Sequence, residues 1–598
     1  MKPGSQAGRE ALAALPEWDL APVAPPAGVP AAIEAVLAAC REFSASHCGV
    51  VGTLDAQALA VLLDKLGAIR NQLLRLASYA AMRHALDVRG EEEQHLVAEV
   101  DECLLEATEL LRCFELEWMR LPALATDPLL ADPALHRDRH FLRSLRRYRP
   151  HVLPEREEHA LACREAAASE AWRDLYDAIV SGLAVEIDGA SLPVDQALDH
   201  LRDGRPEVRR QVHPAVERAV GPHLDVLARC YDSLVADRLA VDGLRGFSNP
   251  RQPADLENEL RAAIVDRALV AVEASSSAAA DWFVRKAKVL GCDRLEHADQ
   301  HSPALGQRTM SYREAVAAVA TAVAEIDPML REIVERFDRE GRVDARPRPE
   351  KSIAVRCISV AQDSPPYIQM RFGGRAADIL GLAHELGHGI GFTLSAAAQT
   401  PLSYEPPPFL SEVAATLTEL LVGEHLVETA ASPEERDALV SLRADKAFDV
   451  LHRQVAITRF EQRAYAARAS GWPLTAARLG DLWLAAMSAH MSPAIAIDPA
   501  SRVGWALVPH VFHGRFYNYT YAMAFLVGLS LLRSWRSDRA RFGRDYLRFL
   551  ARGASAPPEE QLAGLGLDLA TTDWSAALSE LRRMIGAGDG AGRASRDG

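Results

Sequence analysis

The sequence PPYIQMRFGGRAADILGLAHELGHGIGF, residues 365–392, joins a strand pattern to a helix pattern. Residues 366–372 are rich in aromatic and β-branched or long apolar side chains and end at Gly373 and Gly374, which signal a turn. Residues 376–391 then have the composition of a helix. The stretch therefore predicts a short strand that leads through a glycine turn into a helix.

The predicted helix contains His384, Glu385 and His388 in the pattern H-E-x-x-H. Residues four apart lie on one face of an α-helix, so both imidazoles can bind one Zn²⁺ while Glu385 reaches a water molecule at the metal. A catalytic zinc ion usually has three protein ligands, so one more is needed. The metzincin pattern would place a histidine at position 394, but this chain has Leu394.

A carboxylate on the next predicted helix can supply the third ligand. In residues 409–420, FLSEVAATLTEL, the apolar residues Leu417 and Leu420 belong to a buried stripe, while Glu412 and Glu419 fall on another face. Glu412 is the candidate third zinc ligand. Glu419, two turns later, is placed to accept a hydrogen bond from a ligating imidazole and fix its orientation.

The residues around the predicted strand allow two interpretations each. Gly373 and Gly374 either form only a turn or let a substrate backbone approach closely, and they are therefore candidate substrate-binding residues. Asp378 either stabilises the helix N-terminus or accepts a hydrogen bond from a zinc ligand. If an edge of strand 366–372 is open, it can pair with an extended peptide beside the metal.

A second segment, residues 505–521, concentrates histidine and tyrosine. It contains His510, His513, Tyr517, Tyr519 and Tyr521. Taken alone, these residues would be interpreted as an aromatic cluster packed under a helix. Beside a zinc motif they become candidate donors, because peptide hydrolysis builds negative charge on the former carbonyl oxygen and a neutral O–H or N–H can stabilise it.

Three stretches resemble the M3 family of zinc oligopeptidases: residues 365–392, 409–422 and 505–532. The similarity is closer to the oligoendopeptidase F branch than to the thimet oligopeptidase branch, and it extends from about Trp18 to about Arg583. It implies a mainly α-helical, two-lobed shell with a small β-sheet beside the zinc helix and a deep substrate channel. It also implies one Zn²⁺ per chain as cofactor and short peptides as substrates.

The resemblance assigns the oxyanion donors to His510, Tyr517 and Tyr519. Family members commonly have aromatic residues directly after the Pro-His pair, whereas residues 511–512 here are Val and Phe. Tyr519 is the first choice and Tyr517 the second, and His513 can act instead of His510 or alongside it as a substrate-binding residue.

These residues predict a zinc metalloendopeptidase that hydrolyses short oligopeptides, with Glu385 as the general base. A zinc carboxypeptidase and a helical protein that binds peptides without cleaving them are the alternatives. The presence of Glu385 argues against the second alternative, because a protein that does not cleave needs no base between its histidines. His297, His301 and His425 lie away from these motifs and are interpreted as structural or exposed.

Composition narrows the remaining choices. The 598 residues are 49% hydrophobic and carry a formal charge of −15, which favours solubility and gives no reason to expect nucleic acid as a partner. The apolar run 522–532 is shorter than the roughly 20 residues that span a bilayer, so no membrane association is expected. Residues 1–20 lack a continuous apolar signal segment, which predicts a cytoplasmic location. The sequence does not indicate an oligomeric state.

Eight cysteines without a C-x-x-C pair predict reduced thiols and no disulfide. Long amphipathic helices are expected between residues 30 and 118. Pro128 and Pro133 predict a connector at 123–138, and Asp188-Gly189 predicts a type I′ hairpin at 183–194. The predicted organisation has four parts: an extension at 1–29, a helical region at 30–197, a catalytic domain at 198–585 and a disordered tail at 586–598.

Overall fold

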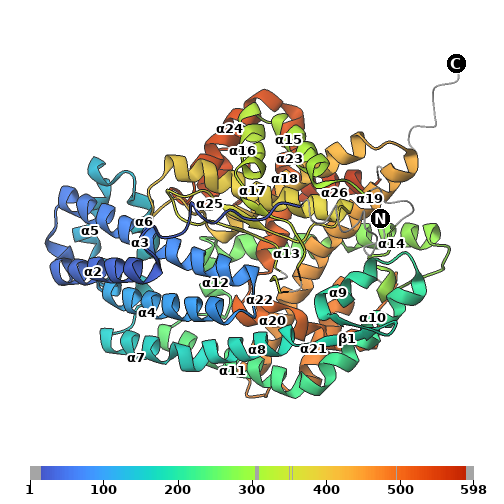
Figure 1. The fold of residues 1–598 in the computed structure, drawn as a ribbon, viewed down its shortest axis with the longest axis horizontal. Helices are drawn as coiled ribbons and strands as arrows, with labels where there is room; N and C mark the ends of the chain where they lie inside the picture. The colour runs from blue at the N-terminus through green and yellow to red at the C-terminus, as the bar shows by residue number, and fades with distance from the viewer. Residues whose placement is uncertain (1–14, 304–308, 349, 353, 493, 587–598) are drawn as a thin grey trace. The chain divides into compact units, whose positions relative to one another are not determined.

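The computed structural model describes residues 15–303, 309–348, 350–352, 354–492 and 494–586. Helices dominate these residues and the strands are few and short, which confirms the mainly α fold (Figure 1). The chain divides into two compact units: unit 1 comprises residues 1–155, 309–422 and 534–569, and unit 2 comprises residues 156–308, 423–533 and 570–598. Each unit combines distant segments, and the boundary near residue 197 remains a prediction.

The larger elements of unit 1 are helices. They are α2 (Val29–His47), α3 (Ala56–Leu86), α4 (Glu91–Arg120), α5 (Ala123–Ala131), α6 (Arg139–Arg146), α15 (Tyr312–Ala324), α16 (Pro328–Arg339), α17 (Ala376–Ala398), α24 (Arg539–Ala551) and α25 (Pro558–Ala563), together with α18 (Pro408–Glu428), which continues into unit 2. The strands are β4 (Val343–Asp344), β5 (Arg356–Ile358) and β6 (Tyr367–Gln369).

The sequence predicts two or three long helices between residues 30 and 118, and the structure has three, α2, α3 and α4, which lie side by side among the blue helices of Figure 1. Asp55 caps α3, since its Oδ1 accepts a hydrogen bond from the backbone N–H of Ala58 at 2.8 Å. Leu62, Leu63 and Leu66 of α3 are buried in the shared core. Each such burial contributes about 1.5–3 kcal/mol, so the apolar stripe rather than intrinsic propensity stabilises this bundle.

The predicted connector at 123–138 is wrong in part, because it contains helix α5 with Pro128 inside it. A proline in a helix removes one backbone hydrogen bond. Thr126 and Leu130 are buried on the same helix, and this packing offsets the loss.

Cys48 and Cys113 form a disulfide, with their Cα atoms 5.6 Å apart. The prediction that all eight cysteines are reduced thiols is therefore wrong for this pair. The two residues are 65 positions apart in the sequence, and the packing of α2 against α4 brings them together. No local spacing pattern could reveal the pair.

The small sheet has the strand order β4-β6-β5, with β6 parallel to β4 and antiparallel to β5. The predicted strand at 366–372 is present as β6, but it is the central strand and both of its edges are paired. Within the described residues, β5 is an edge strand, with Cys357 opposite Ile368. The open edge considered for strand 366–372 is therefore absent from β6, and within the described residues β4 and β5 are the edge strands.

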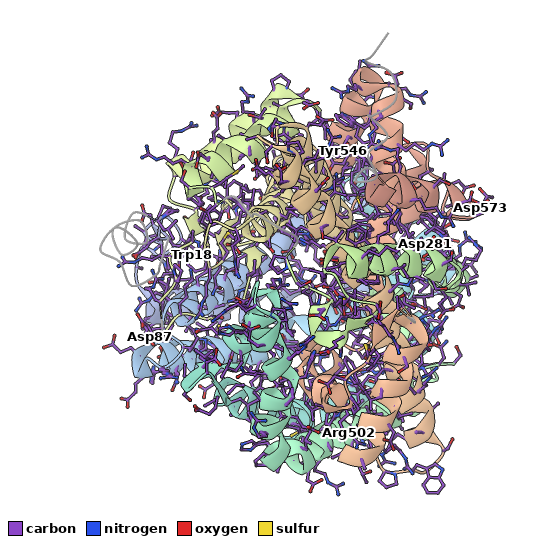
Figure 2. All side chains as sticks on the ribbon, turned by 90° about the vertical axis from the view of Figure 1, so that its right-hand side faces the viewer. Trp18, Asp87, Asp281, Arg502, Tyr546 and Asp573 are labelled. Atoms are coloured by element: carbon purple, nitrogen blue, oxygen red, sulfur yellow. A yellow bond between two sulfur atoms is a disulfide. The ribbon has the colours of Figure 1, made fainter. Side chains whose placement is uncertain are left out.

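Part of the N-terminal extension packs on this sheet. The indole N–H of Trp18, labelled in Figure 2, donates to the carbonyl oxygen of Ile368 at 2.8 Å. Its ring meets that of Tyr367 edge to face, with the centroids 6.3 Å apart. Residues 1–14 and, apart from Gly586, the tail predicted at 586–598 lie outside the described residues.

Unit 2 is also helical. Its elements include α7 (Glu155–Glu165), α8 (Ala171–Ser181), β1 (Ala184–Ile187), β2 (Ala190–Pro193), α9 (Val194–Asp199), η5 (His200–Arg202), α10 (Pro206–Val220), α11 (Leu224–Arg245), α12 (Gln252–Glu257), α13 (Ala262–Ala274), α14 (Ser276–Val289), β3 (Leu295–Glu296), η7 (His297–Asp299), α19 (Pro433–Phe448), η8 (Asp449–Arg453), α20 (Gln454–Ala469), α21 (Ala476–His490), β7 (Ile495–Ala496), η9 (Pro499–Leu507), α22 (Pro509–His513), α23 (Tyr519–Ser537) and α26 (Ser575–Gly586).

Two local predictions in unit 2 are confirmed. Strands β1 and β2 form an antiparallel hairpin whose turn residues Asp188 and Gly189 have φ values of 52° and 77°, as a type I′ turn requires. The apolar run 522–532 forms part of α23 and is largely buried. In the part of the chain that the structure describes, no helix is both long and apolar enough to cross a membrane.

Candidate metal centre

Helix α17 carries His384, Glu385 and His388, and its first turn is fixed by Asp378. The Asp378 carboxylate accepts hydrogen bonds from the backbone N–H groups of Gly373 and Arg375, each at 3.0 Å. Of the two interpretations of Asp378, these bonds support stabilisation of the helix N-terminus.

The glycine turn before α17 needs at least one glycine for structural reasons. Gly374 has a φ of 81°, and a Cβ at this position would lie 2.7 Å from the carbonyl oxygen of Met310. The backbone of Met310 also donates a hydrogen bond to the carbonyl oxygen of Gly374 at 2.9 Å. These contacts explain Gly374 as part of a tight turn, and substrate binding by Gly373 and Gly374 stays a prediction.

Helix α17 approaches α18 closely at Gly387, the fourth residue of the H-E-x-x-H pattern. A Cβ on Gly387 would lie 2.6 Å from the Cα of Ala415 and 2.9 Å from the carbonyl oxygen of Ala414. Only glycine permits this approach without a shift of one helix. The close packing lets Glu412, one turn before this contact on α18, reach the two histidines on α17.

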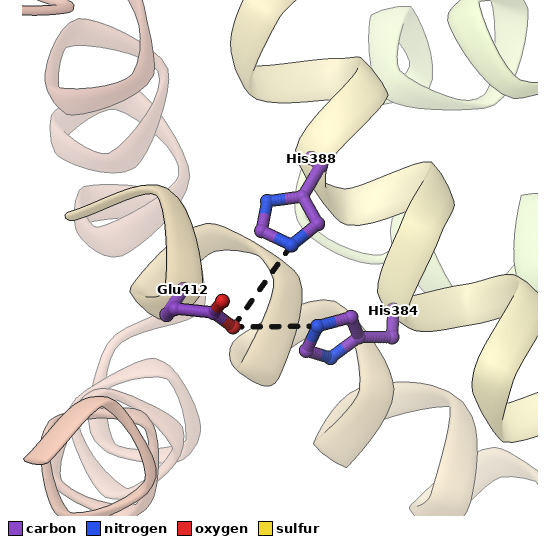
Figure 3. A group of neighbouring side chains, drawn as sticks. All are labelled: His384, His388 and Glu412. Carbon is purple, nitrogen blue, oxygen red and sulfur yellow. Dashed lines mark ion pairs between the residues drawn. The ribbon is translucent and has the colours of Figure 1, made fainter. Parts of the chain in front are cut away.

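The three predicted ligand side chains meet in one place (Figure 3). The Nε2 atom of His384 lies 3.4 Å from Oε2 of Glu412, and the Nε2 atom of His388 lies 3.9 Å from the same oxygen. One ligand atom from each residue lies within 4.8 Å of the others. Metal–ligand bonds of about 2.0–2.2 Å require such separations, and two imidazoles with one carboxylate are a ligand set of catalytic zinc sites. The donor set therefore fits one divalent metal ion.

The outer nitrogen of each imidazole has its own partner on α18. The Nδ1 atom of His384 lies 3.2 Å from Oε2 of Glu419, the bond that the sequence predicted. The Nδ1 atom of His388 lies 2.8 Å from Oγ of Ser411, a partner that the sequence analysis missed although Ser411 precedes Glu412. Such contacts fix the orientation and tautomer of ligating histidines.

The two imidazoles have opposite pKa shifts. Burial lowers the pKa of His388 to about 4, which keeps this ring neutral and able to bind a metal. Burial also opposes the charged form of His384, but hydrogen bonds with Glu412 and Glu419 outweigh it and raise the pKa of His384 to about 10. Because a ligating imidazole must be neutral at the bound nitrogen, metal binding at His384 is coupled to proton release.

Glu385 lies between the two histidines and is buried, with 6% of its surface exposed. Burial, together with the negative charge of Glu385, raises the pKa of the Cys357 thiol well above its usual range. Cys357 belongs to β5, and α17 packs against this strand. The edge strand of the small sheet therefore lies beside the residue that the sequence predicts to be the general base.

The His and Tyr segment forms a separate cluster in unit 2. The hydroxyl of Tyr521 lies 3.2 Å from Nε2 of His510. The rings of His510 and Tyr517 stack with their centroids 5.4 Å apart, and Tyr517 meets Tyr521 edge to face at 5.3 Å. His510, Tyr517 and Tyr521 are thus in mutual contact, and we call them the His-Tyr cluster.

Tyr519, the first choice of the sequence analysis, has different partners. Its ring is fully buried, its hydroxyl donates to the carbonyl oxygen of Ala254 at 3.2 Å, and it accepts a hydrogen bond from Nδ2 of Asn258 at 3.3 Å. Tyr517 lies in the turn before α23 and Tyr521 in the first turn of that helix, and both contact His510. The hydroxyl of Tyr519 is engaged inside unit 2, and a donor role for any of the three tyrosines stays a prediction.

His513 also lies outside the His-Tyr cluster. It is exposed, and its Nε2 is 3.0 Å from Oδ1 of Asp177. Substrate binding by His513 remains a prediction, and this contact gives the residue a structural role at the surface.

Charged residues far away in the sequence hold the turn that presents the His-Tyr cluster. Arg238 of α11 donates to the carbonyl oxygens of Val511, at 3.0 Å, and Phe512. Glu461 of α20 accepts from the backbone N–H of Phe516 at 2.9 Å, and Phe516 has a φ of 55°. Sequence analysis could not find Arg238 and Glu461, since neither belongs to a motif.

The chain is similar to known peptidases. Residues 330–579 match the model of Peptidase family M3, and residues 117–184 match the model of Oligopeptidase F. An oligoendopeptidase F homolog of Lactococcus lactis subsp. lactis is 22% identical over 554 residues, covering 89% of this chain and 91% of the relative. Oligopeptidase PepF of Bacillus subtilis is 22% identical, covering 73% of this chain and 66% of the relative.

Solved structures with the same fold include a putative peptidase from Chlamydophila abortus, with a TM-score of 0.78, 22% identity and coverage of 96% of this chain and 97% of that one. Oligoendopeptidase-F from Enterococcus faecium has a TM-score of 0.72 at 18% identity, with 94% and 98% covered. The two family matches and the named relatives show that the chain belongs to peptidase family M3, as a metalloendopeptidase of the oligoendopeptidase F type.

Proposed function

We propose that this chain is a zinc endopeptidase that hydrolyses short peptides, with His384, His388 and Glu412 as the zinc ligands and Glu385 as the general base. One observation carries the proposal. Ligand atoms of His384, His388 and Glu412 lie within 4.8 Å of one another, and the buried Glu385 lies on the helix of the two histidines. The names of the relatives, oligoendopeptidase F and oligopeptidase, support oligopeptides as the substrate class.

The chemistry divides between the metal and the chain. A zinc ion held by His384, His388 and Glu412 would supply Lewis-acid chemistry for a water molecule and for the scissile carbonyl group. Glu385 accepts the proton of the attacking water and then delivers it to the nitrogen of the leaving amine. Glu419 and Ser411 hold the two imidazoles in the orientation that ligation needs, as their hydrogen bonds of 3.2 and 2.8 Å support.

Two further elements complete the proposal. The free edge of β5 pairs with the backbone of an extended peptide, which holds the scissile bond parallel to the sheet. The His-Tyr cluster supplies O–H and N–H donors for the oxygen that becomes negative, with Tyr521 and His510 as the first pair and Tyr517 as the alternative. Tyr519 contributes to the packing of unit 2 rather than to this step.

The test uses the purified full-length protein and a mixture of peptides of graded length, with products identified by mass spectrometry. We expect internal cleavage of short peptides and about one zinc per chain by elemental analysis. Glu385→Gln keeps the shape of the side chain but cannot accept the proton, so it should retain zinc and lower kcat by about 10²–10⁴-fold.

Glu428→Gln is the matched control, because Glu428 is an exposed residue at the end of α18 and should leave both zinc content and kcat unchanged. Undiminished cleavage by Glu385→Gln would remove the general base from the proposal. Release of single C-terminal residues would instead identify a carboxypeptidase, and a protein without stoichiometric metal would exclude zinc.

A further inference from the structure

Unit 2 contains a cavity of about 300 Å³ that shares no residue with the metal centre or the His-Tyr cluster. Its walls come from α9, η5, α10, η7, η8, α21 and η9, all of which belong to unit 2. The volume is at the lower end of the range for sites that bind small molecules, about 300–1,000 Å³. We call it the unit 2 cavity.

One positively charged side chain of this cavity lacks a close acidic partner. Arg453 lines the cavity, and among the described residues its guanidinium group has no hydrogen-bond or ion-pair partner. The nearby Asp449 carboxylate is already engaged, since Oδ1 accepts from Nε2 of Gln300 at 3.1 Å and Oδ2 lies 3.5 Å from Nδ1 of His301. Arg453 acts on Asp449 only through its charge. Burial raises the pKa of the Asp449 carboxyl group, and the positive charge of Arg453 partly offsets this rise.

The histidines of the cavity are neutral, and its other arginine is already paired with a carboxylate. Burial lowers the pKa of His297 to about 3 and also lowers the pKa values of His213 and His301, so the three imidazoles are neutral. Arg202 also lines the cavity and is paired with Asp199 at 3.2 Å at the surface. The guanidinium group of Arg453 is therefore the charged group of the cavity wall that can still form a close pair with an anion.

The rest of the wall is apolar. Trp483, Met487 and Met491 line it from α21 and the residue after it, and Val503 and Leu507 line it from η9. Methionine and tryptophan side chains adapt to apolar groups of several shapes. The cavity therefore offers a guanidinium group and an apolar wall within a space that holds one residue-sized group.

We propose that the unit 2 cavity binds a carboxylate that carries a neighbouring apolar side chain, as at the C-terminal residue of a peptide ending in leucine. Arg453 binds the carboxylate through its paired N–H groups, and the apolar side chain contacts Trp483 and Met487. Recognition of a peptide end in this cavity does not involve the metal site. The proposal therefore holds whether or not the metal centre hydrolyses the same peptides.

The first experiment is isothermal titration of the full-length protein with N-acetyl-leucine and with N-acetyl-leucinamide, which lacks the carboxylate. We expect saturable binding of the acid and at least tenfold weaker binding of the amide. Arg453→Met keeps an apolar stem of similar length, and it should weaken binding of the acid at least tenfold while changing that of the amide little. The control is Arg463→Met, an exposed arginine on α20 outside the cavity, which should bind like the wild type.

A second measurement needs no variant. Labelling of the wild-type protein with phenylglyoxal, followed by mass spectrometry of peptides, should show that N-acetyl-leucine protects Arg453 from modification and that the amide does not. Equal affinity for acid and amide, unchanged affinity of Arg453→Met, or full labelling of Arg453 at saturating acid would overturn the proposal. The Glu385→Gln protein should bind the acid normally, which separates this proposal from the one on catalysis.

Discussion

The hydroxyl groups of Tyr519 and Tyr521 have different partners although only one residue separates them. Tyr521 contacts His510, whereas Tyr519 is enclosed by Asn258 and Ala254. Some hydrogen-bond donors bond the developing oxyanion more strongly than they bond the substrate carbonyl. Removal of such a donor lowers kcat and changes KM little. The two tyrosines should therefore respond differently to loss of the hydroxyl.

We expect Tyr521→Phe to lower kcat by about 10²–10³-fold with unchanged zinc content, since one donor to the oxyanion is lost. Tyr519→Phe should keep kcat near the wild-type value and lower the free energy of unfolding by about 1–3 kcal/mol, because it leaves buried polar groups without their partner. Steady-state kinetics and thermal unfolding of both variants measure these effects. Wild-type kcat in Tyr521→Phe and a large loss in Tyr519→Phe would restore the assignment made from sequence.

The part of the site that sequence could predict is the part encoded by local spacing. His384 and His388 lie four residues apart on one helix, and Glu412 and Glu419 share the next helix, so their faces follow from helix geometry. Ser411 was missed because serine is common and its contact with His388 depends on how two helices cross. Arg238 is 273 residues from Val511, and only the folded chain brings them together.

At the scale of elements, the contact between α17 and α18 rests on Gly387. We expect Gly387→Ala to lower the free energy of unfolding by about 1–3 kcal/mol, because its Cβ would lie 2.6 Å from the Cα of Ala415 and force the helices apart. Zinc affinity should fall with it, since Glu412 would move away from the histidines. Thermal unfolding and metal titration measure the two effects.

Gly381 on the same helix is the control for this substitution. A Cβ there would meet no atom within 4 Å, so Gly381→Ala should stabilise α17 by about 0.5–1 kcal/mol and leave zinc affinity unchanged. If both alanine variants bound zinc like the wild type, the close helix contact would not be what positions Glu412.

The turn between α22 and α23 should make stability depend on pH through Glu461. Burial raises the pKa of Glu461 from 4.5 to about 8 in the folded chain. The folded chain therefore binds this proton more tightly than the unfolded chain, so the contribution of Glu461 to stability is complete below pH 4.5 and decreases as the pH rises towards about 8.

We expect Glu461→Gln, which mimics the neutral carboxyl group, to remove this decrease. Between pH 5 and 8 the free energy of unfolding should fall less steeply in Glu461→Gln than in the wild type, by up to about 1.4 kcal/mol per pH unit. Denaturant unfolding across this range measures the difference. Exposed Glu428→Gln should keep the wild-type slope, and identical slopes for Glu461→Gln and wild type would show that Glu461 is ionised when buried.

Helices and strands could be predicted where a single segment of sequence determines them. They could not be predicted where contacts with distant segments determine them. The long helices α2 to α4 follow from their apolar stripes, and the hairpin of β1 and β2 follows from Asp188-Gly189. Helix α5 forms despite Pro128 because its residues pack in the core. The local sequence does not show whether that packing outweighs the effect of the proline. The central position of β6 depends on pairing with β4 and β5, which come from other parts of the chain.

At the scale of the whole molecule, the disulfide between Cys48, at the end of α2, and Cys113, in α4, joins residues of unit 1 that are 65 positions apart in the sequence. Such a bond stabilises a protein by about 2–4 kcal/mol, mainly by restricting the unfolded chain. We expect Cys48→Ser to unfold at a lower temperature than the wild type under oxidising conditions and at the same temperature under reducing conditions. Circular dichroism at 222 nm measures both.

Cys163→Ser is the control, because Cys163 is exposed and not part of a disulfide. It should match the wild type under both conditions. A wild-type melting temperature that does not change on reduction would mean that the bond contributes nothing to stability.

Unit 1 is assembled from three separate stretches of the chain, and this determines when the metal helix receives its cover. Helix α24 packs on α17, where Gln399 donates to the carbonyl oxygen of Ala551 at 2.8 Å. A nascent chain that has reached residue 533 holds all three metal ligands and Glu385, yet it lacks α24. The helix that bears the catalytic motif can therefore be fully packed only after the ribosome has synthesised α24, late in translation.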